Sequence, residues 1–368
     1  MASIAPAAQP VGSGAVPPAS DADRPRALTT TTVDDVMSVV GSAVGALGVV
    51  WIIFYRLLPL SGALGFVICW YTVFLALYTG VTAMSHPRTA VVDRLARALI
   101  TGAAGIVGLA LVFTIVFTFV RGRHALLHLN FYTKDASGVS PTAPLNQGGI
   151  LHAIVGTFIE LAIATAISLP LGIGAAIYMS EVGGRLARVV RTVVEAMTAL
   201  PDLVAGLFIY TTVIVALRFE KGGLTAALAL AITMLPIIAR TAEVQLRIVP
   251  GGLREASLAL GSPKWRMVLQ IVIPTAATGL ATALILAFAR AVGETAPVLI
   301  ASGATPFLRF NPTGDPMNSL PLYIFTSVRT GEPLEIERAF GAACVLLTIV
   351  LLLFVALRLL ARQKGTAR

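Results

Sequence analysis

The chain has 368 residues, of which 57% are hydrophobic and only 12% are charged, and its net charge is +9. This composition excludes an ordinary soluble globular domain, in which about a quarter of the residues are charged. The apolar residues gather into stretches of roughly 20, which is the length that crosses a bilayer as a helix. The sequence therefore predicts an all-α integral membrane protein.

Residues 1–35 are rich in Ala, Pro, Ser and Thr and contain no apolar segment of the signal-peptide kind. They predict a disordered cytoplasmic tail. Eight apolar stretches follow, of which the sixth is the shortest and is expected to continue toward Val249. The predicted transmembrane helices are Val39–Leu60, Ala63–Met84, Ala98–Val120, Leu151–Met179, Val193–Leu217, Leu224–Ile238, Thr275–Ala301 and Phe340–Leu360.

The basic residues decide the orientation that we expect. Counted from a cytoplasmic N-terminus, most of the 27 basic residues fall in the tails and in the loops after the second, fourth and sixth stretches. Cytoplasmic loops carry such an excess of Lys and Arg. Both termini are therefore predicted to be cytoplasmic, and the positive charge gives no reason to expect a nucleic-acid partner.

The polar motifs divide the chain. Residues 36–97 hold two apolar stretches and a basic loop without any such motif, and they predict an accessory two-helix hairpin. Residues 98–368 then form a six-helix core. In its last outer loop, Leu320–Val328 is too short to span but apolar enough to form a re-entrant or interfacial element, with Ser319 and Tyr323 expected at its outer edge.

Arg290 and Glu294 lie within an otherwise uncharged stretch, Thr275–Ala301. A charge near the bilayer centre costs ~2.5–3.5 kcal/mol on insertion scales, so such residues usually line a pathway or face a partner. Residues four apart share one face of a helix. A solute path is the favoured interpretation, and an internal ion pair that only allows insertion is the alternative.

The sequence gives no support for ATP hydrolysis, metal binding or catalysis by this chain. The chain has no Gly-Lys dipeptide and hence no P-loop, so if ATP drives transport another subunit must hydrolyse it. His124 and His128 are one turn apart but have no carboxylate or cysteine beside them, so no metal site is expected. No catalytic constellation is found, and we expect neither an enzyme nor a bound cofactor.

The loop at residues 250–274 predicts two short helices with a sharp bend. Leu253–Leu260 has good helix formers, Gly261 is placed to end that helix, and Ser262-Pro263 would supply an N-cap and a first-turn proline for the next. A charged, bent projection of this kind suits docking into a groove on a partner.

Within this loop, Glu255-Ala256-Ser257, then Gly261, then Ile271-Val-Ile-Pro274 resembles the EAA loop of bacterial ABC importer permeases, with Ser257 and Ile273 as mild departures. In that family the loop forms coupling helices that insert into an ATPase subunit. The resemblance implies the same role for six residues of this loop. They are Arg254, Glu255, Ala256, Ser257, Gly261 and Lys264.

The run Arg290-Ala-Val-Gly-Glu294-Thr295-Ala-Pro297 resembles the signature of the phosphate-specific permeases among the type I ABC importers, and Pro297 favours the A-type subunit. The resemblance covers about residues 98–368. It implies a bacterial cytoplasmic (inner) membrane protein with three partners: a homologous C-type permease, an ATPase dimer that uses ATP and Mg, and an extracytoplasmic phosphate-binding protein.

An arginine and a carboxylate in the path are suited to recognise phosphate. The planar fork of an arginine matches phosphate oxygens, and a carboxylate could accept the O–H that phosphate keeps and sulfate lacks. The expected pathway residues are Arg290, Glu294, Thr295, Asp202 and Glu160. For Asp202 and Glu160 a capping or pairing role away from the path is open. The alternative functions are a permease for sulfate or molybdate, and an ion-coupled secondary transporter or channel.

Overall fold

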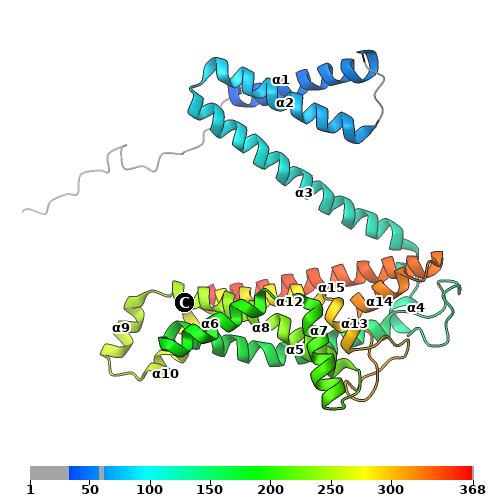
Figure 1. Ribbon diagram of the computed structural model, residues 1–368, viewed down its shortest axis with the longest axis vertical. Helices are drawn as coiled ribbons and strands as arrows, with labels where there is room; N and C mark the ends of the chain where they lie inside the picture. Colours follow the sequence, from blue (N-terminus) through cyan, green and yellow to red (C-terminus); the bar gives the residue numbers. More distant parts are fainter. Residues whose placement is uncertain (1–32, 58–61, 367–368) are drawn as a thin grey trace, which may run out of the picture. The chain divides into compact units, whose positions relative to one another are not determined.

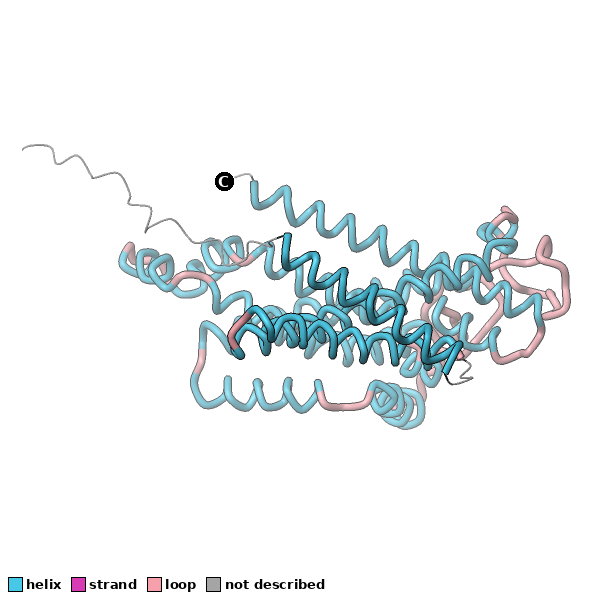
Figure 2. The backbone as a smooth tube through the Cα atoms, turned by 90° about the horizontal axis from the view of Figure 1, so that it is seen from above, coloured by secondary structure: helices cyan, strands magenta, loops and turns pink. Residues whose placement is uncertain are grey.

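The computed structural model describes residues 33–57 and 62–366, and within these ranges all regular structure is helical (Figures 1 and 2). Of the tail predicted for residues 1–35, the first 32 residues lie outside the described part. The chain divides into two compact units, Met1–Leu111 and Val112–Arg368, and each is described by itself.

The first unit consists of two packed helices and the start of a third. Trp70 Nε1 donates a hydrogen bond to the carbonyl oxygen of Ala43 over 3.0 Å, and Arg94 Nη2 lies 2.5 Å from Asp35 Oδ1. Most of the large apolar side chains of these helices are exposed, as expected of helices surrounded by lipid. The helices are α1 (Val33–Ile52) with its wider last turn η2 (Ile53–Leu57), α2 (Ala63–Ser85) and α3 (Arg88–Leu126).

The second unit begins within α3 and holds the remaining helices. Three of these helices end in, or begin with, wider turns, labelled η3, η4 and η5. The elements are α4 (Asn130–Thr133), α5 (Leu151–Ile177), η3 (Tyr178–Val182), α6 (Gly184–Thr198), α7 (Asp202–Ile209), η4 (Tyr210–Ala216), α8 (Gly223–Ile248), α9 (Gly251–Ala259), α10 (Lys264–Met267), η5 (Val268–Val272), α11 (Ile273–Thr275), α12 (Ala277–Val292), α13 (Ala296–Ala301), α14 (Leu320–Val328) and α15 (Pro333–Thr366).

Helix α8 is at the centre of this unit and packs against both α5 and α12. Many of its buried residues are alanines, and it meets small residues on its neighbours. A Cβ atom added to Gly172 of α5 would lie only 2.7 Å from Cγ2 of Ile238. Small residues allow this close approach, which drives helix association in lipid, where there is no hydrophobic effect between helices.

Six described helices are long and apolar enough to cross a membrane, and two bent helix pairs raise the number to as many as eight. This agrees with the eight stretches predicted. The expected extension of the sixth stretch is confirmed, because α8 runs on to Ile248.

Two of the predicted stretches are not continuous helices. In the fifth, α6 and α7 meet at a bend of 103°, because Pro201 between them lacks an N–H donor and fixes its φ angle. In the seventh, the helical segment before Ala276 meets α12 at 72°. Helix α12 then ends at Val292, and α13 is a separate helix with Pro297 in its first turn. The prediction of unbroken helices was wrong at both places.

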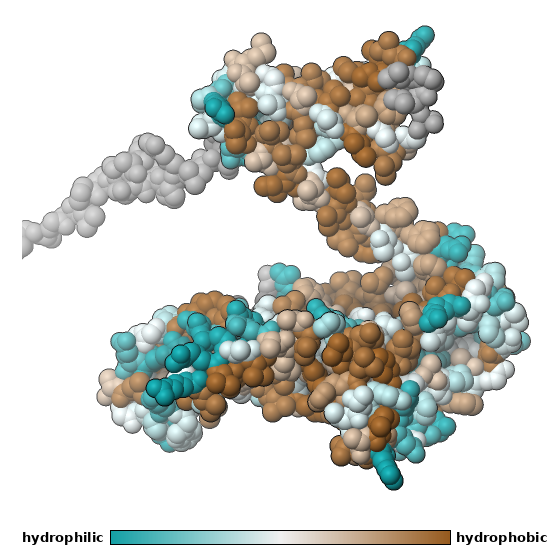
Figure 3. Space-filling model, viewed as in Figure 1, coloured by the Kyte–Doolittle hydropathy of each residue, from teal (hydrophilic) through white to brown (hydrophobic). Residues whose placement is uncertain are grey.

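Side-chain polarity in the second unit follows its helices. Figure 3 shows apolar residues along the bundle and hydrophilic residues gathered toward α9 and α10 at one end and toward the loops near α4 at the other. Polar ends and an apolar middle are what a bilayer requires of a bundle that spans it.

Candidate functional site

Arg290, Asp202 and Glu294 form one group of ion pairs, which we call the Arg290 cluster. Arg290 Nη2 lies 2.7 Å from Asp202 Oδ2, and its Nε lies 3.2 Å from Glu294 Oε1. The arginine side chain is 51% exposed and that of Asp202 is 31% exposed, whereas Glu294 is 11% exposed. The structure therefore brings three of the predicted pathway residues together.

Two helix breaks position these side chains. Pro201 precedes α7, so Asp202 is its first residue and lies at the positive end of the helix. Arg290 lies in the last turn of α12, where the helix dipole favours a cation. Because α12 ends at Val292, Glu294 does not share a helix face with Arg290 as predicted. The pair forms across the turn between α12 and α13.

A close helix contact holds α7 near this turn. A Cβ atom on Gly206 would lie 2.7 Å from Cα of Pro297 and 3.0 Å from its carbonyl oxygen. A backbone atom cannot move aside as a flexible side chain can, so only glycine permits this separation. Gly206 of α7 and Pro297 of α13 thereby keep Asp202 within reach of Arg290.

A cavity of about 60 Å³ lies beside the Arg290 cluster. Asp202 and Arg290 line it together with Thr198, Thr233 and apolar side chains, but Glu294 does not. One water needs about 10–15 Å³ of such volume, so the cavity has room for several waters or a small inorganic ion. The guanidinium and the Asp202 carboxylate are the charged groups that an entering ion would meet.

The other two predicted pathway residues take no part in these ion pairs. Thr295 immediately precedes α13, and its carbonyl oxygen accepts the Leu299 N–H at 2.9 Å. Glu160 of α5 is 1% exposed, and its Oε1 accepts a hydrogen bond of 2.9 Å from Ser302 Oγ. Ser302 Oγ also contacts the carbonyl oxygen of Met317. Glu160 thus joins α5 to the loop between α13 and α14 and has no contact with Arg290 among the described residues.

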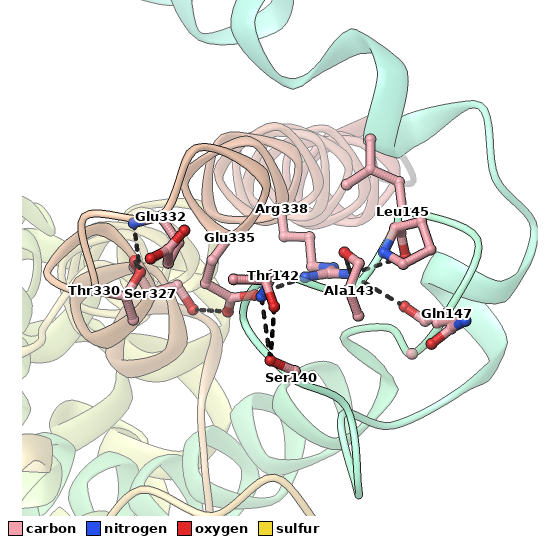
Figure 4. Close-up of polar contacts among 12 residues, drawn as sticks. Ser140, Thr142, Ala143, Leu145, Gln147, Ser327, Thr330, Glu332, Glu335 and Arg338 are labelled. Carbon is pink, nitrogen blue, oxygen red and sulfur yellow. Dashed lines mark hydrogen bonds and ion pairs between the residues drawn. The ribbon is translucent and has the colours of Figure 1, made fainter.

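Sequence reasoning missed a second arginine. Arg338 of α15 donates from Nη1 to Glu335 Oε2 at 3.0 Å and from Nη2 to the carbonyl oxygens of Ala143 and Pro144 at 2.7 and 3.0 Å. Figure 4 shows its side chain directed into the loop that precedes α5. We call this group, with the residues that bond Glu335, the Arg338 cluster. A Glu and an Arg three residues apart at the start of an apolar helix were the available signal.

The Arg338 cluster also includes two residues of α14. Glu335 Oε1 accepts hydrogen bonds from Ser327 Oγ at 2.7 Å and from the Tyr323 hydroxyl at 3.2 Å. Burial, with the nearby Glu335 carboxylate as a smaller cause, raises the pKa of Tyr323, so the phenol keeps its proton and donates. The cluster fastens α14, α15 and the loop before α5 to one another.

Ser319 and Tyr323 are not at an exposed edge as predicted. Their exposed fractions are 2% and 5%, because α14 packs on α15 and α5 and turns these residues inward. A second cavity, of about 230 Å³, lies against Tyr323 and is also lined by His152 and Asn318.

The loop at residues 250–274 does form two short helices. Gly261 follows α9 with φ of +78°, its N–H donates to Leu258 O at 3.0 Å, and the next N–H, of Ser262, donates to Ser257 O at 3.2 Å. This is the Schellman arrangement that a glycine permits at a helix end. The predicted stop is confirmed.

The predicted cap of the second helix was wrong. Helix α10 begins at Lys264, Pro263 occupies the N-cap position, and the cap makes no side-chain hydrogen bond. The prediction also started the first helix too late, since α9 begins at Gly251 directly after Pro250. In both cases the fixed φ of the proline lets it precede the helix.

The residues of this loop face different ways. Glu255, Ala256, Gly261 and Lys264 are exposed, whereas Ser257 is 6% exposed. Two large apolar side chains of the loop are also exposed, Leu260 by 89% and Trp265 by 60%.

Arg254 points back toward the helix bundle. It forms a double hydrogen bond with Glu181, from Nε at 3.1 Å and from Nη2 at 2.8 Å. It also donates to the carbonyl oxygens of Leu246 and Val249 at the end of α8, at 2.7 and 2.6 Å. Carbonyl oxygens in the last turn of a helix are open to side-chain donors, so Arg254 anchors α9 to α8 and to η3.

No three His, Cys, Asp or Glu side chains come together as a metal site within the described ranges. Of the two histidines noted in the sequence, His124 pairs with Glu337 through Nδ1 at 2.8 Å, and His128 Nδ1 lies 2.8 Å from the carbonyl oxygen of His124.

Known proteins resemble this chain over most of the second unit. Residues 168–365 match a family model described as a binding-protein-dependent transport system inner membrane component. The phosphate transport system permease protein PstA 1 of Mycobacterium tuberculosis (strain CDC 1551 / Oshkosh) is 38% identical over 241 residues, which are 65% of this chain and 79% of the relative. PstA of Pasteurella multocida (strain Pm70) is 33% identical over 253 residues, 68% and 88% of the two chains.

A solved structure of the MetNI methionine ABC transporter aligns with 59% of this chain and 94% of its own, with a TM-score of 0.47 and 22% identity. The family match covers more than half of this chain, and the two PstA proteins are matched over more than two thirds of their length. The chain therefore belongs to the family of binding-protein-dependent transport system inner membrane components.

Proposed function

We propose that this chain is the A-type permease subunit of an ATP-driven inorganic phosphate importer and forms half of its transmembrane path. The Arg290 cluster carries the proposal, because a half-exposed guanidinium beside a cavity, in an apolar segment, is suited to bind an anion. An arginine fork matches phosphate oxygens in two places at once. The names of the relatives, phosphate transport permeases, support phosphate as the substrate.

The loop at residues 250–274 is the proposed contact with the ATPase. Glu255, Ala256, Gly261 and Lys264 are exposed there, and the apolar surface of Leu260 beside them would be buried by a partner. ATP and Mg²⁺ would bind in the partner ATPase dimer. This chain would bind no cofactor and catalyse no reaction of its own.

Charge and the family suggest the orientation and the other partners. We place both termini and α9 on the cytoplasmic side, and α14 with the loops near it on the other side, facing an extracytoplasmic phosphate-binding protein. A homologous C-type permease would supply the second half of the path. Residues 1–35 and the hairpin 36–97 precede the matched region and are proposed to be accessory to the 98–368 core.

A matched pair of arginine variants tests the proposal. Arg240 is also 51% exposed and lies 2.7 Å from a carboxylate, that of Glu195, but outside the Arg290 cluster. In proteoliposomes that contain the importer copurified from its native membrane, we expect Arg290→Lys to abolish most uptake of labelled phosphate, because a point charge cannot replace the fork. Arg240→Lys should transport normally.

Three outcomes would contradict the proposal. Normal phosphate uptake by Arg290→Lys would remove the site from the path. Competition by sulfate or molybdate at lower concentrations than phosphate would indicate a permease for another oxyanion. Uptake that needs no ATP and no second protein would indicate a secondary transporter or a channel.

A further inference from the structure

We infer that Asp202 is an internal counter-ion that an entering anion must displace from Arg290; this inference rests on the proposed function. The carboxylate of Asp202 occupies Nη2 of the guanidinium at 2.7 Å, which is the shorter of the two ion pairs. The guanidinium has further N–H groups on Nη1 and Nη2, but an anion that reaches them from the cavity would enter the same small space that the Asp202 carboxylate lines. Asp202 and the anion therefore compete for the same arginine.

The two carboxylates differ in position. Asp202 lines the cavity and is 31% exposed, whereas Glu294 is 11% exposed and is absent from the cavity wall. Glu294 follows Arg290 by only four residues in the chain, so it stays beside the arginine whatever α7 does. Asp202 is 88 residues away in sequence and meets Arg290 only through the fold. Glu294 is thus the fixed partner of Arg290, and Asp202 is the displaceable one.

The negative charge of Asp202 explains why an anion must displace it. With both carboxylates ionised, the Arg290 cluster carries one net negative charge, and an anion brought to Arg290 would stand beside the Asp202 carboxylate. Like charges placed side by side disfavour binding strongly. The anion can bind well only when the carboxylate has turned away, so Asp202 keeps Arg290 closed to anions at rest.

The fold offers the displaced carboxylate another favourable position. Asp202 is the first residue of α7, and the N-cap residue Pro201 provides no side-chain hydrogen bond. The N–H groups of the first turn attract a negative charge there. A rotation of the short side chain toward these groups frees Nη2 without moving α7, which is held against α13 by the close contact of Gly206 with Pro297.

Equilibrium binding separates this role from that of a substrate acceptor. The importer, copurified with its partner chains and placed in nanodiscs without the binding protein or ATP, is titrated with radiolabelled inorganic phosphate. Asp202→Asn keeps the size of the side chain but removes its charge, and we expect phosphate to bind about tenfold more tightly. Labelled sulfate should gain at least as much. An acceptor of the phosphate O–H would give weaker phosphate binding instead.

Controls keep the outcome decisive. Glu195→Gln removes a carboxylate that lies 2.7 Å from its own arginine and is 51% exposed, and it should not change phosphate binding. Asp202→Ser should act like Asp202→Asn if the amide variant assembles poorly. Phosphate binding that is unchanged, weaker or absent in both Asp202 variants would overturn the inference.

Arg290→Met distinguishes a failure of the proposed function from a failure of this inference. If that variant binds labelled phosphate as well as the parent importer does, the Arg290 cluster is not the anion site, and the proposed function fails together with the inference. If Arg290→Met loses phosphate binding while the Asp202 variants do not gain it, the site stands and only the counter-ion role of Asp202 is wrong.

Discussion

The second unit holds two arginines that use their donors in opposite ways. Arg338 is 4% exposed, and its Nη groups are directed to the Glu335 carboxylate and to backbone carbonyl oxygens of the loop before α5. Arg290 is 51% exposed, is directed to two carboxylates, and lies against a cavity. Arg290 lies within a predicted apolar stretch and Arg338 lies just before one, and neither position shows by itself how the side chain is used.

The difference shows how to separate a structural charge from a functional one. A buried guanidinium with its donors satisfied by fixed groups of its own chain can bind nothing further, and its removal leaves those groups without partners. An accessible guanidinium whose partner can turn away can exchange that partner for a ligand. The Arg338 cluster should therefore determine stability and the Arg290 cluster transport, and the following predictions test that division.

The largest effect is expected from Arg338→Met. It leaves the Glu335 carboxylate, which is 14% exposed, without its arginine, and breaking a pair that is largely buried costs about 3–5 kcal/mol. A detergent titration of the purified chain should show that loss in the free energy of unfolding. Arg329→Met, at an exposed arginine of the same region, is the control and should stay within about 0.5 kcal/mol of the parent chain. Equal stability of the two variants would contradict the structural role.

The Arg290 cluster should respond in the reverse manner. In Arg290→Met combined with Glu294→Gln, the Asp202 carboxylate loses its arginine but remains 31% exposed at the N-terminus of α7, so the free energy of unfolding should fall by no more than about 1 kcal/mol. Uptake of labelled phosphate should fall roughly 100-fold, since hydrogen bonds to charged groups contribute about 1.5–3 kcal/mol each. Near-normal uptake would reduce this pair to an aid to insertion.

A smaller effect is expected at the proposed contact with the ATPase. Gly261 has φ of +78°, and a Cβ atom added there would meet no other atom within 4 Å, so Gly261→Asp causes no steric clash but strains the backbone and adds a negative charge to the docking surface. Combined with Glu255→Ala, it should lower the ATPase recovered by copurification roughly tenfold, for a strain of about 1–3 kcal/mol. The chain itself should insert normally. Gly251→Ala, at the exposed start of α9, is the control, and recovery equal to that control would argue against docking through this loop.

The smallest effect concerns the sides of the membrane that the two ends of the bundle face. In a Cys69→Ser background, Thr313→Cys in the exposed loop before α14 should react with a membrane-impermeant thiol reagent added from outside. Arg185→Cys, exposed in the first turn of α6, should react only after the cytoplasmic side is opened. Neither variant should change transport measurably. Labelling in the opposite order would invert the orientation argued from the basic residues.

Local pattern was enough for much of this protein. Apolar stretches of spanning length located the candidate membrane helices because a bilayer imposes the same requirement on any sequence. The Gly261 stop was predictable because a Schellman end depends on a few neighbouring residues. The four-residue spacing of Arg290 and Glu294 also led to a real ion pair, although α12 ends between them.

Only the tertiary structure decided which distant groups meet. Asp202 and Arg290 are 88 residues apart, Glu160 and Ser302 are 142 apart, and Arg338 and Ala143 are 195 apart. Each pair depends on how helices pack and where they bend at prolines, and hydropathy records neither. Composition and local spacing thus determined that this chain is a membrane protein with a pair of charges in its seventh apolar stretch. Packing decided that one arginine is fully satisfied within the fold and that the other remains accessible to an anion.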